Sequence, residues 1–429
     1  MNIIDNIQID NLWGNGSVIK FRCDRKFNFL IGENGTGKTT VINLIAAALT
    51  GDFERLDKTE FDRIMIRLKP ISGSKKPSIE VKKTKKQDNI PFYDISYEFR
   101  HSQKENPIKF DFDAIEQERF FRGSPPRVLR ERMFRDNYID IRKQLDSFVN
   151  VSWLSIHRHN EEVRPGEDRR NVPAIDQKLV SLNNSLVRYF SALARKYSDN
   201  IIDFQKKTLL SVLTPEKSEA LIAFTSSIDV ENEKNALAGI FEVLGVEEKH
   251  YAQKIRSHFD KFNQAVKARE QNTALNVDQF ATIYNTWRSH SLVQDYEELQ
   301  QKKADIFKSR DNFISVINEL LGGRKKMSLS DRNELSFETK NNKPIPIEEL
   351  SSGEKQLLII LGEALLQQEK AVVYIADEPE LSLHISWQET LTSSISSLNP
   401  NAQIIFATHS PDIVNSHSDK IINMEDVIK

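Results

Sequence analysis

Apolar and polar positions along the first 110 residues follow the patterns of β-strands. Apolar side chains occupy every second position or short continuous runs, and turn-forming residues separate these segments. Residues 39–49 are instead apolar over about three helical turns, and they follow a glycine-rich segment. We therefore expect strands around one helix, with the strands at residues 3–9, 18–21, 27–31, 64–68, 78–82 and 95–99.

The pattern changes between residue 111 and about residue 330, where helical periodicity dominates and glycine becomes sparse. Within this region, apolar side chains also follow a heptad spacing, which Lys303 and Arg310 interrupt. Two interpretations stay open: a helical hairpin or short coiled coil, or a helix packed on its own domain. The heptad positions are Leu292, Tyr296, Leu299, Ile306, Phe313, Ile317 and Leu320.

An alternation of helices and strands follows residue 345. Such alternation predicts a mainly parallel sheet, which antiparallel N-terminal strands make a mixed one. The helices are expected at residues 354–367 and 386–397, and the strands at 371–376, 403–407 and 420–424. The chain then has one α/β domain in two halves, residues 1–110 and 331–429, split by a helical insertion at residues 111–330 that forms an arm or assembly lobe.

Composition narrows the class of protein. The chain has 429 residues, of which 39% are hydrophobic and 28% charged, as in a globular protein. Its formal net charge of -2 means that any contact with nucleic acid must come from a local basic patch. A single cysteine, Cys23, excludes an internal disulfide and disfavours a zinc cluster. No apolar run is long enough to span a membrane, and residues 1–10 read as a strand rather than a signal peptide, so we expect the cytoplasm.

A phosphate-binding loop is predicted between the strand 27–31 and the helix 39–49. Its sequence fits G-x-x-x-x-G-K-[ST], in the strand-loop-helix context that this motif requires. Lys38 is expected to reach the β- and γ-phosphates of ATP, Thr39 to bind Mg²⁺, and Lys38 to be exposed when the loop is empty. The predicted nucleotide-binding residues here are Gly32, Asn34, Gly35, Thr36, Gly37, Lys38, Thr39 and Thr40.

Two acids, Asp377 and Glu378, end the apolar strand that begins near residue 371. We expect this strand to lie beside the phosphate-loop strand, so that Asp377 holds the metal and Glu378 polarises the attacking water. The alternative is a strand followed by an ordinary acidic turn, which the order of the motifs disfavours.

Two further segments lie near these acids in the sequence. In the segment of residues 350–356, read L-S-S-G-E-K-Q, Ser351 or Ser352 can cap a helix, and Gly353 lets a phosphate approach the backbone. His409 follows the next apolar strand, within the segment T-H-S at residues 408–410. The alternatives are an ordinary helix cap and a capping or core histidine.

Together these motifs resemble the ABC ATPase superfamily, with residues 350–356 as its signature segment. The signature resembles L-S-G-G-Q/E, with Ser352 in place of the first glycine. The resemblance implies a dimer or larger homo-oligomer in which Ser351 and Gly353 act on the nucleotide of another protomer. Ser352 belongs to the same predicted nucleotide contact. The residues expected to act on their own protomer's nucleotide are Lys38, Asp377, Glu378 and His409, with Glu378, His409 and Lys38 as the catalytic group. The resemblance implies that His409 contacts the γ-phosphate and senses whether it is present.

The run D-E-P-E-L-S-L-H at residues 377–384, with A-T-H-S-P at 407–411, resembles the RecF/OLD-like ATPases of the AAA_15 and AAA_21 groups. Ile385 stands where that group often has proline. The resemblance covers roughly residues 1–50 and 345–425. OLD nucleases carry a Toprim domain after the ATPase, but we expect none here because the chain ends at Lys429.

ATPases of this kind without a nuclease domain resemble subunits of two-component anti-phage defence systems, such as the PARIS ATPase AriA, the Septu ATPase PtuA and retron-associated ATPases. By this resemblance the chain regulates a separate effector protein, often a nuclease, and the trigger is a nucleic acid or a phage protein. No membrane partner is expected. The rival functions are a RecF-like DNA-repair ATPase that binds DNA directly and a scaffold stabilised by ATP with little turnover; Glu378 disfavours the scaffold.

Two basic clusters are candidate contact surfaces for phosphates, an acidic protein or a neighbouring subunit. The lysine cluster has the alternative of being a set of solvated turns. A polar group around His157 and Glu161 is expected to be a solvated loop rather than a metal site. The clusters are Arg119, Arg122, Arg127, Arg130, Arg132 and Arg135, and Lys75, Lys76, Lys82, Lys83, Lys85 and Lys86.

Overall fold

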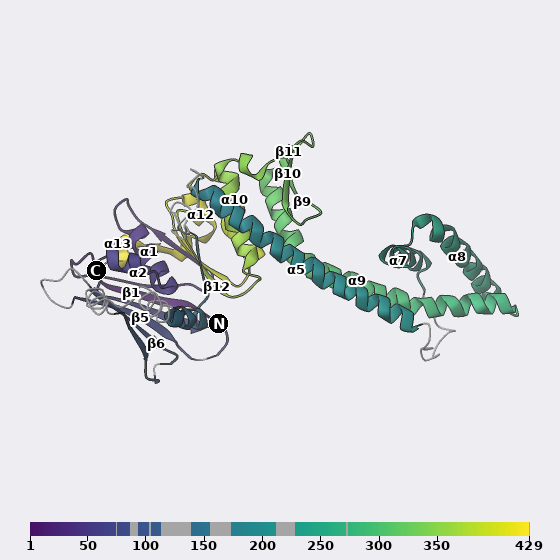
Figure 1. Ribbon diagram of the computed structural model, residues 1–429, viewed down its shortest axis with the longest axis horizontal. Helices are drawn as coiled ribbons and strands as arrows, with labels where there is room; N and C mark the ends of the chain where they lie inside the picture. Colours follow the sequence, from purple (N-terminus) through teal and green to yellow (C-terminus); the bar gives the residue numbers. More distant parts are fainter. Residues whose placement is uncertain are drawn as a thin grey trace, which may run out of the picture. The chain divides into compact units, whose positions relative to one another are not determined.

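A computed structural model of the chain describes residues 1–73, 75–85, 93–102, 104–112, 139–154, 173–211, 228–271 and 273–428. It consists of two compact units, an α/β unit and a helical unit (Figure 1). The α/β unit contains residues 1–186 and 312–429, and the helical unit contains residues 187–311. The helical unit is therefore shorter at both ends than the predicted insertion at 111–330. None of the described helices combines the length and apolar character needed to cross a membrane.

A parallel sheet lies at the centre of the α/β unit. Its strand order is β14-β3-β13-β12-β8, and every neighbouring pair is parallel. The predicted class, α/β with a parallel sheet, is confirmed, but β13 lies between β3 and β12. The acidic strand is therefore not the direct neighbour of the phosphate-loop strand. The bounds are β3 (Phe27–Ile31), β8 (Val151–Leu154), β12 (Val372–Asp377), β13 (Ala402–Ala407) and β14 (Ile421–Asn423).

Strand β8 corrects the predicted start of the insertion. It falls within residues 111–330, yet it completes the parallel sheet by pairing with β12. The preceding side chains of Ile141, Leu145 and Phe148 are buried in the same core as the first half of the chain. The helical insertion therefore does not begin at residue 111. In the sequence, a four-residue strand is too short to show the alternation of apolar and polar side chains that would distinguish it from a loop.

The N-terminal strands form a second, separate sheet, which is antiparallel with the order β2-β1-β4-β5-β6-β7. All the strands predicted in the first 110 residues are present. Their bounds are β1 (Asn2–Leu12), β2 (Ser17–Arg22), β4 (Arg63–Pro70), β5 (Ser78–Lys85), β6 (Tyr93–Arg100) and β7 (Ile108–Phe112), with a short helix α2 (Phe53–Lys58) before β4.

Helix α1 (Lys38–Thr50) is buried almost all round because it shares one hydrophobic core with both sheets. This core joins Ile7 of β1 to Val373 of β12. The amide of Gln403, fully buried at the start of β13, adds a polar link: Oε1 accepts from the Ile4 N–H at 2.8 Å and Nε2 donates to the Ile4 carbonyl at 2.7 Å. The phosphate loop is thereby held between two sheets.

Two helices follow the motifs of the C-terminal half, α10 (Ser352–Leu366) and α11 (Ile385–Leu398). Helix α10 packs on the face of the parallel sheet opposite α1, where the Tyr374 hydroxyl donates to the Ile360 carbonyl at 2.6 Å. The remaining elements are the antiparallel strands β9 (Lys325–Leu329), β10 (Leu335–Thr339) and β11 (Pro344–Ile345), and the short helices η1 (Ile347–Glu349), α12 (Pro411–Val414), η2 (Asn415–Lys420) and α13 (Met424–Val427).

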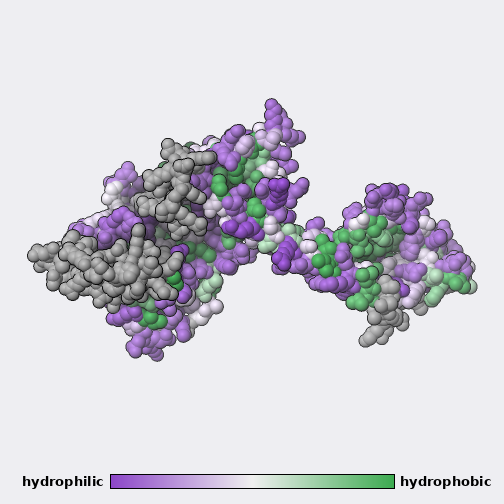
Figure 2. Space-filling model, in the orientation of Figure 1, coloured by the Kyte–Doolittle hydropathy of each residue, from purple (hydrophilic) through white to green (hydrophobic). Residues whose placement is uncertain are grey.

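The helical unit contains α7 (Val230–Val243), α8 (Glu248–Glu270) and parts of the long helices α5 (Ala174–Ser211) and α9 (Val277–Leu321). Here α5 and α9 run antiparallel, since Tyr197 contacts Phe307 and Phe204 contacts Tyr296. Apolar side chains gather on the visible face of this unit (Figure 2).

The predicted heptad positions lie along the single helix α9. Leu299, Phe313 and Ile317 are buried, but near residue 306 the buried side chain is Phe307 rather than Ile306. The predicted helical hairpin thus corresponds to the antiparallel pair of α5 and α9, whereas the predicted coiled coil stays a prediction.

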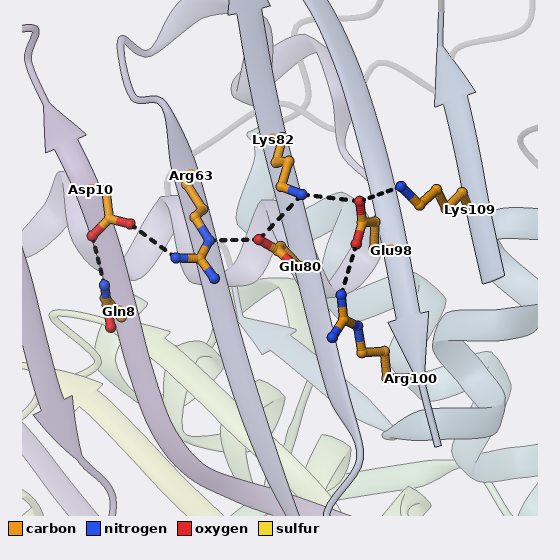
Figure 3. Close-up of polar contacts among 8 residues, drawn as sticks. All are labelled: Gln8, Asp10, Arg63, Glu80, Lys82, Glu98, Arg100 and Lys109. Carbon is orange, nitrogen blue, oxygen red and sulfur yellow. Dashed lines mark hydrogen bonds and ion pairs between the residues drawn. The ribbon is translucent and has the colours of Figure 1, made fainter. Parts of the chain in front are cut away.

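Cross-strand ion pairs cover the outer face of the antiparallel sheet (Figure 3). Arg63 Nε lies 2.6 Å from Glu80 Oε1, and Lys82 Nζ lies 2.9 Å from Glu98 Oε1. The Glu80 and Glu98 side chains are only 6% and 7% exposed, so the cations cover the carboxylates. Opposite charges across neighbouring strands stabilise their pairing.

The lysine cluster is not one surface. Lys82 belongs to the ion pairs above, whereas the adjacent Lys83 points to the other face of β5 and is buried. Its Nζ donates to the carbonyls of Leu56, Asp57 and Thr59, which caps the end of α2. The predicted phosphate contact at Lys83 is therefore wrong. The Lys85 side chain, Lys86, the arginine cluster and the group around His157 lie outside the described residues.

Candidate nucleotide-binding site

The glycines of the phosphate loop have backbone conformations that side chains rarely adopt. Gly32 has φ 156°, and Gly35 and Gly37 both have φ 89°. A Cβ on Gly37 would also lie 2.4 Å from the ring of Trp13, in the turn between β1 and β2. The loop thus requires glycine for both conformation and space. Trp13 was missed in the sequence because nothing local links it to a loop more than twenty residues later.

The first turn of α1 has no side-chain cap, although Ser351 caps α10 and Ser410 caps α12. The first N–H groups of a helix have no partner inside the helix, and they carry the positive end of its dipole. Uncapped N–H groups next to a glycine-rich turn fit phosphate oxygens.

Lys38 is not exposed as predicted: only 5% of its surface is accessible. Its Nζ donates to the carbonyls of Gly32 at 2.8 Å and Glu33 at 2.9 Å. Burial lowers the pKa of Lys38, while the carboxylates of Glu378, Asp377 and Glu425 act in the opposite direction. The ammonium thus folds back on the backbone of its own loop.

Thr39 and Asp377 meet although they are 338 positions apart. Thr39 Oγ1 donates to Asp377 Oδ1 at 3.2 Å. One oxygen comes from the start of α1 and the other from the carboxyl end of β12. A hydroxyl and a carboxylate are hard oxygen donors of the kind that Mg²⁺ prefers, so the pair fits a magnesium ion that also contacts phosphates.

Glu378 and His409 lie at the carboxyl ends of β12 and β13. His409 Nε2 is 3.9 Å from Glu378 Oε1, and both side chains reach solvent, at 42% and 32% exposure. Glu378 has a φ of 47°, and its N–H donates to the Ala407 carbonyl at 2.8 Å. The parallel pairing of β12 with β13 therefore brings the predicted base and the predicted sensor together.

The signature segment is a well-formed helix start. Ser351 caps α10 in a capping box, in which the Glu354 carboxylate accepts from the Ser351 N–H at 2.8 Å. Ser351 and Ser352 are exposed. In the described part of the chain, no hydrogen bond or ion pair joins this segment to the phosphate loop of the same chain.

Gly353 also has a packing role within its own chain, while its predicted approach to a phosphate stays a prediction. A Cβ at this position would lie 2.4 Å from the Ser382 carbonyl, so glycine allows the segment after Glu378 to pack on α10. His384, the residue that distinguishes the run at 377–384, caps α11 by accepting from the Ser386 N–H.

A known protein family matches most of the chain. A family model described as "AAA domain, putative AbiEii toxin, Type IV TA system" (AAA_21) matches residues 27–415. The "Retron Vc95 probable ATPase" of Vibrio cholerae serotype O1 biovar El Tor is 32% identical over 144 residues. That match spans 30% of this chain and 27% of the relative.

Two similar solved structures are SMC head domains. The head with an extended coiled coil, bound to the C-terminal domain of ScpA, from Pyrococcus furiosus has a TM-score of 0.46 and 13% identity, covering 99% of this chain and 93% of the other. The head with a coiled coil and joint from Pyrococcus yayanosii has a TM-score of 0.44 and 14% identity, covering 99% and 95%.

Proposed function

Because the chain belongs to the AAA_21 family of ATPase domains, we propose that it binds ATP with Mg²⁺ at the phosphate loop and hydrolyses it. The observation that carries this proposal is the Thr39–Asp377 contact at 3.2 Å. It joins the two halves of a magnesium site at the end of an uncapped helix. If the loop matched the motif by chance, no contact with the acidic end of a distant strand would be expected.

Each polar residue of the site then has a role. The N–H groups at the start of α1 hold phosphate oxygens, and Lys38 exchanges the carbonyls of Gly32 and Glu33 for phosphate. Thr39 and Asp377 would hold Mg²⁺, which would supply positive charge beside the phosphates. Glu378 accepts a proton from the attacking water, and His409 contacts the γ-phosphate.

We also propose that a second copy completes the site. Ser351 and Ser352 are exposed at a helix start and do not contact the phosphate loop of their own chain. A helix N-terminus presented to solvent is suited to the nucleotide of another protomer. ATP would then hold two chains together, and hydrolysis would release them.

We propose a role in anti-phage defence, as the regulatory ATPase of a separate effector such as a nuclease, and the partial match to a retron ATPase supports this role. The helical unit is the proposed contact surface. Val277, Phe280 and Tyr284 are exposed with the i, i+3, i+7 spacing of one face of α9. Exposed apolar faces mark interaction sites.

The test of hydrolysis is Glu378→Gln. The amide keeps the shape of the side chain but cannot accept the proton, so turnover should fall by ~10²–10⁴-fold while ATP binding is retained. Association measured by analytical ultracentrifugation should become ATP-dependent and long-lived. Glu334→Gln, on the exposed turn between β9 and β10, is the matched control. Unchanged turnover in Glu378→Gln would remove Glu378 from the role of base.

The defence role is tested separately by phage challenge of cells that carry the gene with its neighbouring open reading frames. Protection should disappear in both Lys38→Ala and Glu378→Gln. Equal protection by these variants, with their ATPase activity lost, would show that hydrolysis is not part of defence.

A further inference from the structure

A buried carboxylate lies directly beneath the loop that carries His409. Glu380 is only 7% exposed, although it is two residues from the partly exposed Glu378. Its Oε1 accepts from the Thr408 hydroxyl at 2.5 Å, from the His409 N–H at 3.0 Å and from the Ser410 N–H at 3.3 Å. All three donors belong to consecutive residues of one loop.

Among the described residues, Glu380 is the acceptor for the His409 N–H, whereas the Ser410 N–H also donates to Thr408 Oγ1 at 2.9 Å. Buried N–H groups need acceptors, and bonds to an ionised acceptor are about twice as strong as neutral ones. The Thr408 N–H donates to the Leu30 carbonyl of β3, so the loop is held on one side by the strand that leads into the phosphate loop and on the other by Glu380. Among the described residues, the polar contact of the His409 ring is the 3.9 Å approach to Glu378.

The segment that carries Glu380 is fixed as well. The Gln356 amide on α10 donates to the Pro379 carbonyl at 2.7 Å, and the Leu383 N–H donates to the Glu380 carbonyl at 2.8 Å. A carboxylate on a fixed turn can define the position of the loop that it binds. Its second oxygen, Oε2, is buried without a partner among the described residues, so the three donors on Oε1 account for the polar contacts of the group.

We propose that Glu380 is a positioning residue for ATP hydrolysis, which acts through His409 by fixing the backbone of residues 408–410. This proposal rests on the proposed ATP site. In this proposal Glu380 does not contact the nucleotide. Without Glu380, residues 408–410 lose the carboxylate oxygen that accepts from all three of them. The imidazole of His409 is then no longer held in a fixed position beside Glu378. The effect falls on turnover rather than on ATP affinity, because the phosphate loop and the Thr39–Asp377 pair are untouched.

The experiment compares Glu380→Gln and Glu380→Ala in wild-type and His409→Ala backgrounds. Glu380→Gln keeps one acceptor oxygen and should lose at most about 10-fold in kcat, whereas Glu380→Ala should lose about as much as His409→Ala, with KM and the Kd of a fluorescent ATP analogue unchanged. In the His409→Ala background, Glu380→Ala should cause no further loss, because residues that act as one unit are non-additive. Glu389→Gln, exposed on α11, is the control.

The proposal is overturned if Glu380→Ala lowers kcat by the same factor in both backgrounds, or if either variant weakens ATP binding as much as turnover. If Glu380→Ala does not fold, the same comparison with Glu380→Gln decides. Failure of the ATP site itself is recognised independently, because Lys38→Ala would then keep wild-type turnover.

Discussion

Lys38 shows how a single residue can serve both the resting loop and the proposed catalytic state. Its ammonium donates to the carbonyls of Gly32 and Glu33. In the proposed catalytic state it would donate to a phosphate instead of these carbonyls. The sequence predicted the residue and its chemistry, but not this second contact, because the reach of a lysine to carbonyls five and six positions earlier depends on the turn of the loop.

Lys38→Ala should abolish nucleotide binding or hydrolysis and also lower stability slightly. Two hydrogen bonds are lost, but solvent can reach part of this loop, so the free energy of unfolding should fall by only about 1 kcal/mol. Isothermal titration with ATP and thermal unfolding measure the two effects.

Lys370→Ala, which removes an exposed lysine in the turn between α10 and β12, is the control for charge. Wild-type turnover in Lys38→Ala would contradict the assignment of this loop.

At the scale of elements, the antiparallel sheet is held by charges as well as by its core. Burial alone would raise the pKa of Glu98, but hydrogen bonds and charges from Lys82 and Lys109 outweigh this and lower it to about 2. Arg100 adds a third cation at 3.4 Å. These side chains come from three neighbouring strands, so the group joins β5, β6 and β7.

Stability should therefore depend on pH through Glu98. A carboxyl whose pKa is lower in the folded state contributes stability above its unfolded value of about 4.5, and this contribution is lost as the pH falls toward about 2. Glu98→Gln should cost about 1–3 kcal/mol at pH 7, and the difference from wild type should shrink between pH 4.5 and pH 2.

Urea unfolding at several pH values measures this difference. Glu105→Gln, in an exposed pair with Lys75, should cost less than about 0.5 kcal/mol at any pH. A Glu98→Gln penalty that stays constant down to pH 2 would show that the loss is one of packing and not of charge.

At the scale of the whole molecule, no hydrogen bond or ion pair among the described residues joins the signature segment to the phosphate loop of the same chain, and this separation supports the proposal that catalysis uses two copies. Ser351→Arg should abolish turnover without weakening ATP binding to the isolated chain. It also removes the cap of α10, which costs about 1 kcal/mol. Ser351→Asn keeps a capping side chain and should retain both stability and most of the turnover.

Mixing Ser351→Arg with Lys38→Ala tests the arrangement of the sites. In a two-site dimer, each mixed pair has one site with both defects and one with neither, so activity appears only if the sites act independently. Measured ATP turnover of the mixture decides this. Normal turnover of Ser351→Arg alone would rule out a composite site.

The sequence alone determined the features that depend on neighbours in the chain. The phosphate loop, the acidic end of β12 and the cap at Ser351 are short segments whose local structure and proposed function follow from residue type and spacing. The strands and helices around them were predictable for the same reason, because the periods of apolar side chains are local. These segments were also enough to identify the ATPase family, which the family match confirmed.

Tertiary structure decided the features that depend on residues far apart in the chain. Insertion of β13 between β3 and β12, the addition of β8 to the sheet and the link from Gln403 to Ile4 all require strand order, which no local pattern encodes. Lys83 became a helix cap, and Glu380 came to lie beneath residues 408–410, because each found its partners across the fold. A buried charge goes where acceptors or donors can satisfy it, and only the packed chain sets where those are.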